Sequence, residues 1–253
     1  MEMFSNLYIS GLRLHKEAEL EDAYVSYLRS LKNVGQLDFN KRVTFFVGEN
    51  GSGKSTLLEA IAVNMGFNPE GGTMNFNFSS QETHSVLYRH MTLTKGVKRP
   101  KDGFFLRAES FYNVATEIDR LDKAVSAPFI HMYGGKSLHR QSHGESFIAL
   151  VLNRFMGNGL YILDEPEAAL SPTRQLSLLV KINELVNNNS QFIIATHSPI
   201  LMAYPQADIL MFDENGIRSI PYEETEHYII TRQFLNNPEK MMDYLFKEDK
   251  DGG

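Results

Sequence analysis

The stretch VTFFVGENGSGKSTLLEAIA, residues 43–62, constrains the fold more than any other part of the chain. A continuous apolar run of strand type leads into a glycine-rich loop, and a helical pattern follows at once. The loop fits G-x-x-x-x-G-K-[ST], a pattern in which backbone N–H groups and the helix start surround phosphate oxygens. An apolar strand covered on both faces is typical of a parallel sheet. The stretch therefore predicts an α/β fold with a phosphate-binding loop between a strand and a helix.

The residue types in this loop indicate how a nucleotide would be held. Glycines let the backbone fold around phosphates, Lys54 is expected to bridge the β- and γ-phosphates, and Ser55 is expected to ligate Mg²⁺. The alternative is a tight strand-to-helix turn with incidental glycines, and the length and context of the pattern favour the phosphate site. The predicted nucleotide-binding residues here are Gly48, Glu49, Asn50, Gly51, Ser52, Gly53, Lys54, Ser55 and Thr56.

A second motif, LYILDE at 160–165, ends an apolar run in two acidic residues. Ligands of open α/β sheets bind beyond the carboxyl ends of the strands, so both carboxylates are expected near the phosphates. Asp164 is predicted to hold Mg²⁺, and Glu165 is predicted to orient and polarise the attacking water. Taken alone, such a stretch is most often a strand that ends in a solvated acidic turn. The phosphate-binding loop favours the functional interpretation.

A third apolar strand, QFIIAT at 191–196, is followed by His197. A single histidine is usually structural or solvated. His197 follows the tip of another predicted parallel strand, where it is expected to sense or hydrogen-bond the γ-phosphate.

The segment SHGES, residues 142–146, precedes the helical pattern FIALVLNRF. Ser142 and Glu145 have the S-x-x-E spacing of a capping box, which satisfies backbone N–H groups at a helix start. A helix start is also an anion site, and Ser142 and Gly144 permit close approach. The segment by itself leaves both a local cap and a ligand contact open.

The order of these motifs resembles that of ABC-type ATPases. YISGLRL near the start, followed by residues 43–62, is similar to the SMC and RecF-like branch. The chain also resembles small bacterial single-domain predicted ATPases in ESFYNVATEID, SHGESF, LDEPEAALSP, IIATHSPIL and YEETEHY. The resemblance implies a P-loop NTPase fold of ABC-ATPase type, with a mostly parallel core sheet, a small antiparallel sheet and a short helical subdomain. It implies one domain over 1–253, with a core lobe at about 1–110 and 157–253 and a signature subdomain at about 111–156.

The resemblance also implies a mechanism. It implies Mg²⁺-dependent binding and hydrolysis of ATP, coupled to closing and opening of a head-to-tail homodimer that sandwiches ATP. The signature of one subunit would cap the γ-phosphate held by the other subunit. The residues expected to act across the dimer are Ser142, His143, Gly144, Glu145 and Ser146. Arg13 is expected near the nucleotide, and a surface arginine on an edge strand is an equal alternative.

Two departures from the family pattern concern the region between the motifs. Residues 57–141 are too few for the long coiled-coil arm of the chromosome-organising members. The usual glutamine that links the metal to the moving subdomain is not evident. Glu109, after GFFLRA, is the candidate for its place as a metal ligand, and Ser110 is the alternative. Gln81 precedes a small antiparallel sheet predicted within 74–109.

Composition restricts other roles. The chain has no cysteine, which excludes disulfides, cysteine zinc sites and thiol catalysis. No run reaches the roughly 18 apolar residues of a membrane helix, and MEMFSNLYIS lacks the layout of a signal peptide. A cytoplasmic protein without membrane insertion is therefore expected. The net charge of −6 argues against a general attraction to nucleic acid. The loop KGVKRPK at 95–101 is a candidate contact for DNA, RNA or an acidic partner, and a solvated loop is the commoner outcome.

Three hypotheses remain for what the ATPase drives. The first is a nucleic-acid-linked or defence process, from the SMC-like resemblance and the basic loop. The second is a nucleotide-gated scaffold that regulates a partner effector protein. The third, a transporter ATPase subunit, is disfavoured because the glutamine loop is not recognisable and the signature is atypical.

Overall fold

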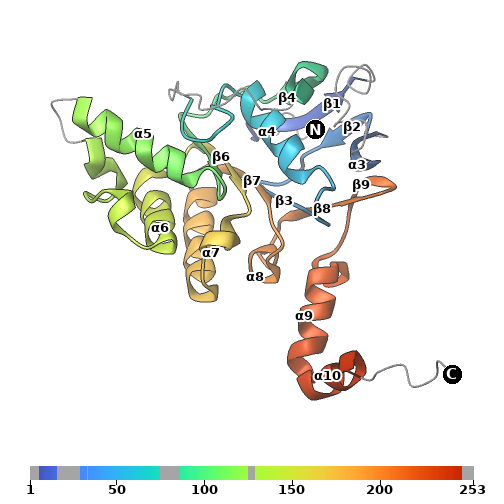
Figure 1. Ribbon diagram of the computed structural model, residues 1–253. Helices are drawn as coiled ribbons and strands as arrows, with labels where there is room; N and C mark the ends of the chain where they lie inside the picture. Colours follow the sequence, from blue (N-terminus) through green and yellow to red (C-terminus); the bar gives the residue numbers. More distant parts are fainter. Residues whose placement is uncertain (1–5, 16–28, 33, 75–85, 125–128, 247–253) are drawn as a thin grey trace.

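A six-stranded sheet forms the centre of the molecule in the computed structural model (Figure 1). The structure describes residues 6–15, 29–32, 34–74, 86–124 and 129–246. The strand order is β5-β6-β7-β3-β8-β9, and every neighbouring pair is parallel except β8 and β9. This confirms the predicted, mostly parallel α/β core. The strands are β3 (Val43–Gly48), β5 (Asp102–Arg107), β6 (Gly159–Asp164), β7 (Gln191–Ala195), β8 (Asp208–Asp213) and β9 (Gly216–Ser219).

A separate three-stranded antiparallel sheet has the order β2-β1-β4. Its strands are β1 (Ile9–Leu14), β2 (Gln36–Asp38) and β4 (Met91–Lys95). The sequence patterns at 36–39 and 43–49 predict a strand pair. This prediction is wrong, because β2 pairs with β1 and β3 lies inside the main sheet. Burial explains the difference. Only the middle residue of β2 is buried, whereas all six residues of β3 are buried and need neighbours on both sides.

The segment at 74–109, predicted as one small antiparallel sheet, is divided between the two sheets. β4 is antiparallel to β1 as expected, but β5 is a parallel edge strand beside β6. Residues 103–106 of β5 are buried, so this strand needs cover on both faces. Residues 75–85, which include Gln81, lie outside the described residues.

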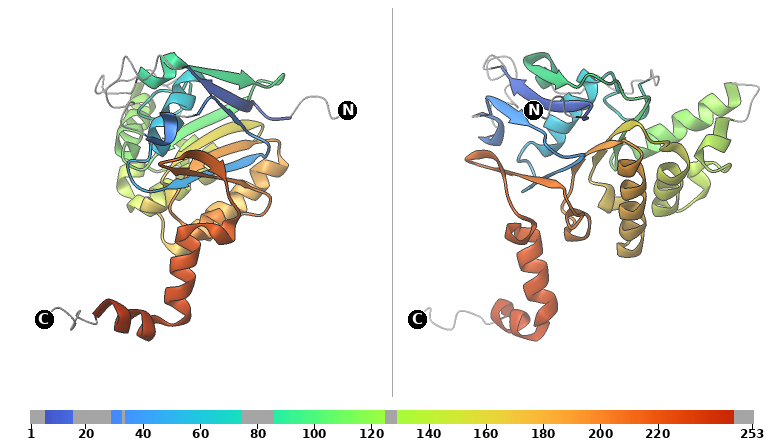
Figure 2. Two further views of the ribbon diagram at one scale, coloured as in Figure 1. Left: turned by 90° about the vertical axis from the view of Figure 1, so that its right-hand side faces the viewer. Right: turned by 180° about the vertical axis from the view of Figure 1, so that it is seen from behind.

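Each face of the main sheet has its own hydrophobic core, because successive residues of a strand point to opposite faces (Figure 2). Phe46 and Ile193 pack on one face with α4 (Lys54–Asn64) and the small sheet. Phe45 and Ile194 pack on the other face with a layer of helices. Burial of each such side chain contributes about 1.5–3 kcal/mol, so the two cores hold the strand tips in place. The helices of the second layer are α5 (Phe111–Ala124), α6 (His143–Arg154), α7 (Pro172–Asn187) and α8 (Pro199–Met202).

Short elements connect these layers. The sequence AYVSYLRSLKN at 23–33 is ambiguous and predicts no single type of element. It lies mostly outside the described residues, and its described part is α3 (Arg29–Lys32). DILMFDENGIRSI at 208–220, with Asn-Gly at its centre, predicts a hairpin. The β8–β9 hairpin confirms it, with Asp213 paired to Gly216 across a turn at Glu214 and Asn215. The 3-10 helices are η1 (Val86–His90), η2 (Phe129–Tyr133), η3 (Leu138–Arg140), η4 (Pro166–Ala169) and η5 (Tyr222–Glu224).

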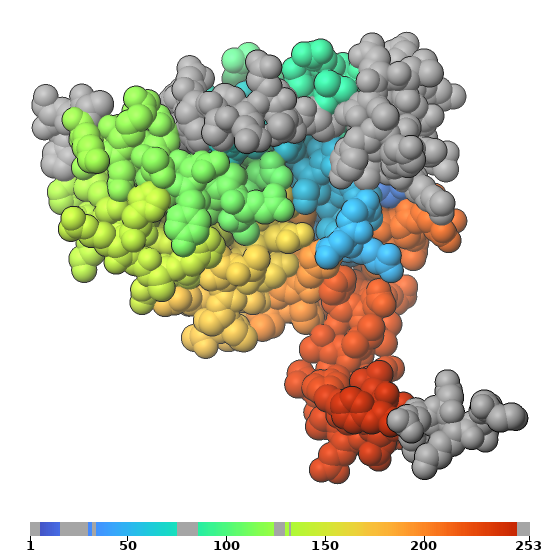
Figure 3. Space-filling model, in the orientation of Figure 1, coloured from blue at the N-terminus to red at the C-terminus, as the bar shows by residue number. Residues whose placement is uncertain are grey.

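The last two helices, α9 (Glu226–Asn236) and α10 (Pro238–Phe246), project from the body as an arm (Figures 1 and 3). The sequence of residues 223–246 predicts a terminal helix or a helix pair, and the structure has the pair. The break falls at Pro238, which has no N–H for a continuous helix. Within the described structure neither helix has a buried residue. Apolar side chains on the arm, such as Leu235 and Phe246, are exposed. None of the described helices is long and apolar enough to span a bilayer.

Candidate functional site

The carboxyl ends of the parallel strands bring the predicted motifs to one edge of the main sheet. The loop after β3, the end of β6 and the end of β7 are adjacent, because β7 lies between β3 and β6. The register pairs Asp164 with Ala195 and, on the other side, with Arg107 at the end of β5. Residues from four separate parts of the sequence are therefore held together by the ladder of the sheet.

The phosphate-binding loop requires glycine at its first position. Gly48 has a φ of 141°, and a Cβ placed there would lie 2.3 Å from the carbonyl oxygen of Phe212. Gly53, at the N-cap of α4, has a φ of 99° and offers no side chain to the N–H groups of the first turn. The loop therefore passes close to β8 and leaves the start of α4 available to an anion.

Lys54 is folded back into this loop. Its side chain is 3% exposed, and Nζ donates to the carbonyl oxygens of Gly48 and Glu49, both at 2.8 Å. Burial lowers the pKa of Lys54, and the nearby carboxylates of Glu165 and Asp164 oppose that change. A buried ammonium held by weak carbonyl acceptors is suited to a stronger, anionic partner.

Ser55 and Asp164 meet as the sequence predicts. The Ser55 hydroxyl donates to Asp164 Oδ1 at 2.9 Å. Burial raises the pKa of Asp164 to about 6, opposed by the Arg107 guanidinium and by the bond from Ser55. No cluster of three His, Asp or Glu side chains suited to a metal occurs among the described residues. One carboxylate and one hydroxyl nevertheless fit Mg²⁺, which takes oxygen ligands and usually keeps waters and substrate phosphates in its shell.

Arg107 is the cation beside Asp164. It lies 3.5 Å from Asp164 Oδ2 through Nε, and its Nη1 donates to Glu59 Oε2 at 2.6 Å. Its Nη2 lies 3.5 Å from Glu109 Oε2. The Glu109 side chain is 86% exposed. It is connected to Asp164 through the Arg107 guanidinium, which lies between the two carboxylates. Ser110, the alternative to Glu109, donates to the carbonyl oxygen of Glu70. The role of Glu109 as a metal ligand stays a prediction.

Glu165 has an unusual backbone conformation. Its φ and ψ are 50° and 52°, in the left-handed region that costs a non-glycine residue of order 1–3 kcal/mol. Its N–H donates to the Ala195 carbonyl at 3.0 Å, and its side chain is 41% exposed. A strained residue held by a neighbouring strand, with an accessible carboxylate, is a candidate catalytic group.

His197 is fixed from three sides. Its backbone N–H donates to Glu167, its Nδ1 lies 3.0 Å from His227 Nε2, and its Nε2 lies 3.6 Å from Glu165 Oε1. That Nε2 is buried and has no hydrogen-bond partner within the described part of the chain. Burial is the main cause that lowers the pKa of His197, followed by the charge of Lys54.

The SHGES segment forms the predicted capping box. Glu145 Oε2 accepts from the Ser142 N–H at 3.1 Å and from the Ser142 hydroxyl at 2.7 Å. A Cβ on Gly144 would lie 2.6 Å from both the Ala169 carbonyl oxygen and Arg174 Nη1, so the segment packs against the loop after Glu165. None of its residues lines the pocket beside the phosphate-binding loop of the same chain. Its action across a dimer stays a prediction.

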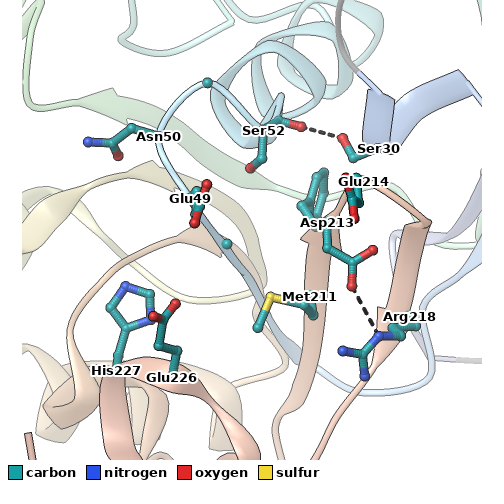
Figure 4. Close-up of a pocket in the computed structure, with 13 residues that line it drawn as sticks. Ser30, Glu49, Asn50, Ser52, Met211, Asp213, Glu214, Arg218, Glu226 and His227 are labelled. Atoms are coloured by element: carbon teal, nitrogen blue, oxygen red, sulfur yellow. Dashed lines mark hydrogen bonds and ion pairs between the residues drawn. The ribbon is translucent and has the colours of Figure 1, made fainter. Parts of the chain in front are cut away.

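That pocket is formed by the phosphate-binding loop, the β8–β9 hairpin and the first turn of α9 (Figure 4). It has a volume of about 540 Å³. Arg218 on β9 and His227 on α9 border it. Arg13 does not; it lies exposed on β1, and its guanidinium is 3.4 Å from Gln36 Oε1. A role for Arg13 in nucleotide binding also stays a prediction.

Two family comparisons match the parts of the chain that carry these motifs. The family described as an AAA domain matches residues 24–114, and the family described as an AAA ATPase domain matches residues 146–202. Each of the two matches covers less than half of the chain. The first match includes the phosphate-binding loop, and the second includes the acidic pair and His197.

Curated proteins similar to the chain include ABC ATP-binding proteins. An energy-coupling factor transporter ATP-binding protein of Methanospirillum hungatei is 27% identical over 78% of this chain and 52% of its own length. An uncharacterised ABC transporter ATP-binding protein of Haemophilus influenzae is 27% identical over 68% of this chain and 70% of its own length. The chain thus spans about half of the first relative.

Solved structures similar to the chain include an SMC head domain and a protein of an ABC transporter complex. An SMC head domain from Thermotoga maritima has 17% identity and a TM-score of 0.45, with 85% of this chain and 99% of that chain covered. The cbiO1 protein from Clostridium perfringens, part of an ABC transporter complex, has 21% identity and a TM-score of 0.49, with 93% and 99% covered.

Sequence reasoning missed three residues of this site: Arg107, Glu167 and His227. Arg107 could have been found as the last residue of a strand next to Asp164, had the β5–β6 pairing been predicted. Glu167 lies within LDEPEAALSP, and burial raises the pKa of its carboxyl. His227 lies within YEETEHY, 30 residues after His197, and only the tertiary fold brings the two rings together.

Proposed function

We propose that the chain is a Mg²⁺-dependent ATPase in which two copies close head to tail around ATP, and in which Glu165 activates water. The contact between Ser55 and Asp164 carries this proposal, because it joins the phosphate-binding loop to the acidic pair at the strand tips. Two more groups lie at this edge of the sheet. Lys54 is a buried cation, and His197 Nε2 has no hydrogen-bond partner among the described residues.

Each residue has a defined task in this proposal. Lys54 exchanges its two carbonyl acceptors for phosphate oxygens, and Ser55 and Asp164 hold Mg²⁺. The ion, when bound, neutralises charge on the phosphate oxygens. Glu165 orients a water and accepts its proton as the water oxygen attacks the terminal phosphorus, which yields ADP and phosphate. His197 donates through Nε2 to a terminal phosphate oxygen.

The position of SHGES supports the dimer part of the proposal. The segment starts α6, packs against residues of the 166–174 region and does not line its own chain's pocket. A helix start with small residues is suited to an anion supplied from outside the chain. Its own capping box must loosen for that, since Glu145 accepts from both the hydroxyl and the N–H of Ser142.

Glu165→Gln tests the proposal directly. The variant keeps the size of the side chain but has no basic carboxylate, so we expect ATP binding to persist while turnover falls at least about 100-fold. The trapped protein should elute as a dimer with ATP in size-exclusion chromatography. Turnover at the wild-type rate would show that Glu165 is not the base.

Ser142→Arg tests the action across subunits. A long side chain at the start of α6 should block closure, so turnover is lost while nucleotide binding by the monomer is kept. Weaker nucleotide binding by the monomer would instead assign Ser142 to a structural cap.

The process that the ATPase serves is proposed to be nucleic-acid-linked or defensive. Lys98, Arg99 and Lys101 are exposed in the loop between β4 and β5, and they offer phosphate contacts. DNA or RNA should then stimulate turnover at low salt, and Lys98→Glu combined with Arg99→Glu should remove that stimulation. A chain that neither binds DNA or RNA nor responds to them at low salt would exclude this assignment.

The second candidate is a nucleotide-gated scaffold for an effector protein. The exposed apolar side chains of the arm favour it, because α9 and α10 bury no residue within the described structure. It predicts slow turnover and a stable complex with another protein, captured with Glu165→Gln in ATP. A transporter subunit is the remaining alternative, and copurification with a polytopic membrane protein would distinguish it.

A further inference from the structure

His197 and His227 form a ring-to-ring contact that the proposed function does not use. His197 Nδ1 lies 3.0 Å from His227 Nε2, and the ring centroids are 5.1 Å apart. The outer nitrogens, His197 Nε2 and His227 Nδ1, are both buried and lack a hydrogen-bond partner among the described residues. Glu165 Oε1, at 3.6 Å from His197 Nε2, is too distant for a normal hydrogen bond.

The contact can hold only one proton between two neutral rings. Burial lowers the pKa of both histidines, which favours the neutral forms near pH 7. In one arrangement His197 donates from Nδ1, so its Nε2 is a lone pair that cannot donate to a phosphate. In the other arrangement His227 donates from Nε2 to His197 Nδ1, and His197 Nε2 carries the proton. Only the second arrangement presents an N–H to the terminal phosphate.

The first turn of α9 is anchored, and this holds the His227 ring against the His197 ring. Thr225, the N-cap, is fully buried, and its hydroxyl donates to the Tyr222 carbonyl at 2.8 Å. The Tyr222 hydroxyl donates to the carbonyl of Pro199, the first residue of α8, at 2.8 Å. Because α8 directly follows the loop of His197, the two histidines are attached to one packed unit. The His197 backbone is held on its other side by Glu167.

We propose that His227 is a positioning residue: its Nε2–H, donated to His197 Nδ1, keeps the His197 ring oriented with Nε2–H toward the terminal phosphate. This inference rests on the proposed function of His197. It assigns to the base of the arm a task in turnover, in addition to any partner that the rest of the arm binds. In this proposal His227 acts through His197, so its effect is expected in kcat more than in ATP affinity.

Two substitutions separate donation from ring shape. His227→Phe keeps a ring of similar size but has no donor, and it should lower kcat by about 10–100-fold, as removal of an orienting hydrogen bond does. His227→Gln places an amide N–H near the former Nε2 and should restore most of kcat. ATP affinity and thermal stability should change little in either variant. His131→Phe, at an exposed histidine of η2, is the matched control and should turn over like the wild type.

A double-mutant cycle tests whether His227 acts through His197. His197→Ala combined with His227→Phe should turn over no more slowly than His197→Ala alone, because the positioned ring is already absent. Fully additive losses would overturn the inference. So would wild-type turnover of His227→Phe, or a loss in His227→Gln as large as in His227→Phe.

Ring nitrogen NMR gives a readout that does not depend on turnover. The Glu165→Gln variant is expected to hydrolyse ATP at least about 100-fold more slowly than the wild type. In this variant with ATP and Mg²⁺, His197 should show a protonated Nε2 and an unprotonated Nδ1. His227→Phe in the same background should lose that preference. A proton on His197 Nδ1 with His227 intact overturns the inference. Wild-type turnover of both Glu165→Gln and Lys54→Ala would instead overturn the proposed function, so the two failures are distinguishable.

Discussion

Helices α4 and α6 both begin after a loop that contains glycine or serine, yet their first turns are satisfied in opposite ways. α4 begins after Gly53, which offers no side chain, and the neighbouring Lys54 is buried against the loop's own carbonyls. α6 begins after Ser142, and Glu145 closes a capping box over that start. The comparison shows that the start of α4 can accept an anion as it stands. At α6 the hydrogen bonds between Glu145 and Ser142 must first break. A site divided in this way remains incomplete until a second subunit supplies an opened α6.

Lys54→Ala should have the largest effect of the variants considered, because it should weaken ATP binding at the start of α4. Removing the buried ammonium deletes charge-assisted hydrogen bonds worth roughly 1.5–3 kcal/mol each, so ATP affinity should fall by at least about 100-fold. Isothermal titration calorimetry with ATP and Mg²⁺ measures the loss. Lys98→Ala, at an exposed lysine outside the pocket, is the control and should bind normally.

A matched pair of variants compares the two regions: Gly48→Ala at the end of β3, where the phosphate-binding loop begins, and Gly144→Ala in the first turn of α6. Gly48 has a positive φ, and the Cβ of an alanine there would lie 2.3 Å from a backbone oxygen, so Ala should lower the free energy of unfolding by about 3 kcal/mol or more. Gly144 has ordinary φ but faces the Ala169 carbonyl oxygen and the movable Arg174, so about 1–2 kcal/mol is expected. Urea unfolding of both variants decides the order, and equal losses would contradict the comparison.

The carboxyl groups beside the first turns of α4 and α6 should make the stability depend on pH with opposite signs. Asp164 accepts from Ser55 of α4, and Glu145 belongs to α6. The pKa of Asp164 is raised to about 6 by burial, so its contribution to stability is complete below about pH 4 and is lost as pH rises through 6. Hydrogen bonds from Ser142 lower the pKa of Glu145, so its contribution is present above the ordinary carboxyl pKa and is lost on acidification. Unfolding curves of Asp164→Asn and Glu145→Gln, measured from about pH 2 to about pH 8, should each remove one of the two slopes.

Ser142→Ala should have the smallest effect on stability. Loss of an N-cap hydroxyl costs about 1 kcal/mol. Turnover should nevertheless fall by more than this loss of stability explains, because the same hydroxyl is proposed to reach the phosphate of the other subunit. Thermal unfolding and steady-state turnover, measured on the same preparation, separate the two. If turnover falls only as far as the loss of stability explains, Ser142 acts only as the N-cap of α6.

Prediction from sequence succeeded where a pattern is local. The strand–loop–helix around Lys54, the capping box at Ser142 and the β8–β9 hairpin each follow from residues within a few positions of one another. Prediction failed where the partner is distant. The strands β2 and β5 have recognisable patterns, but only burial on one or both faces decides which sheet each one joins.

The sequence by itself determined which residue types can bind phosphate and metal, because glycine, lysine, serine and aspartate have those properties wherever the backbone presents them. The tertiary structure alone decided which side chains surround them. Arg107 lies beside Asp164 because β5 and β6 are parallel in register, and His227 meets His197 because the first turn of α9 packs on α8. Such neighbours depend on how two hydrophobic cores place separate strands and helices, and no short stretch of the chain carries that information.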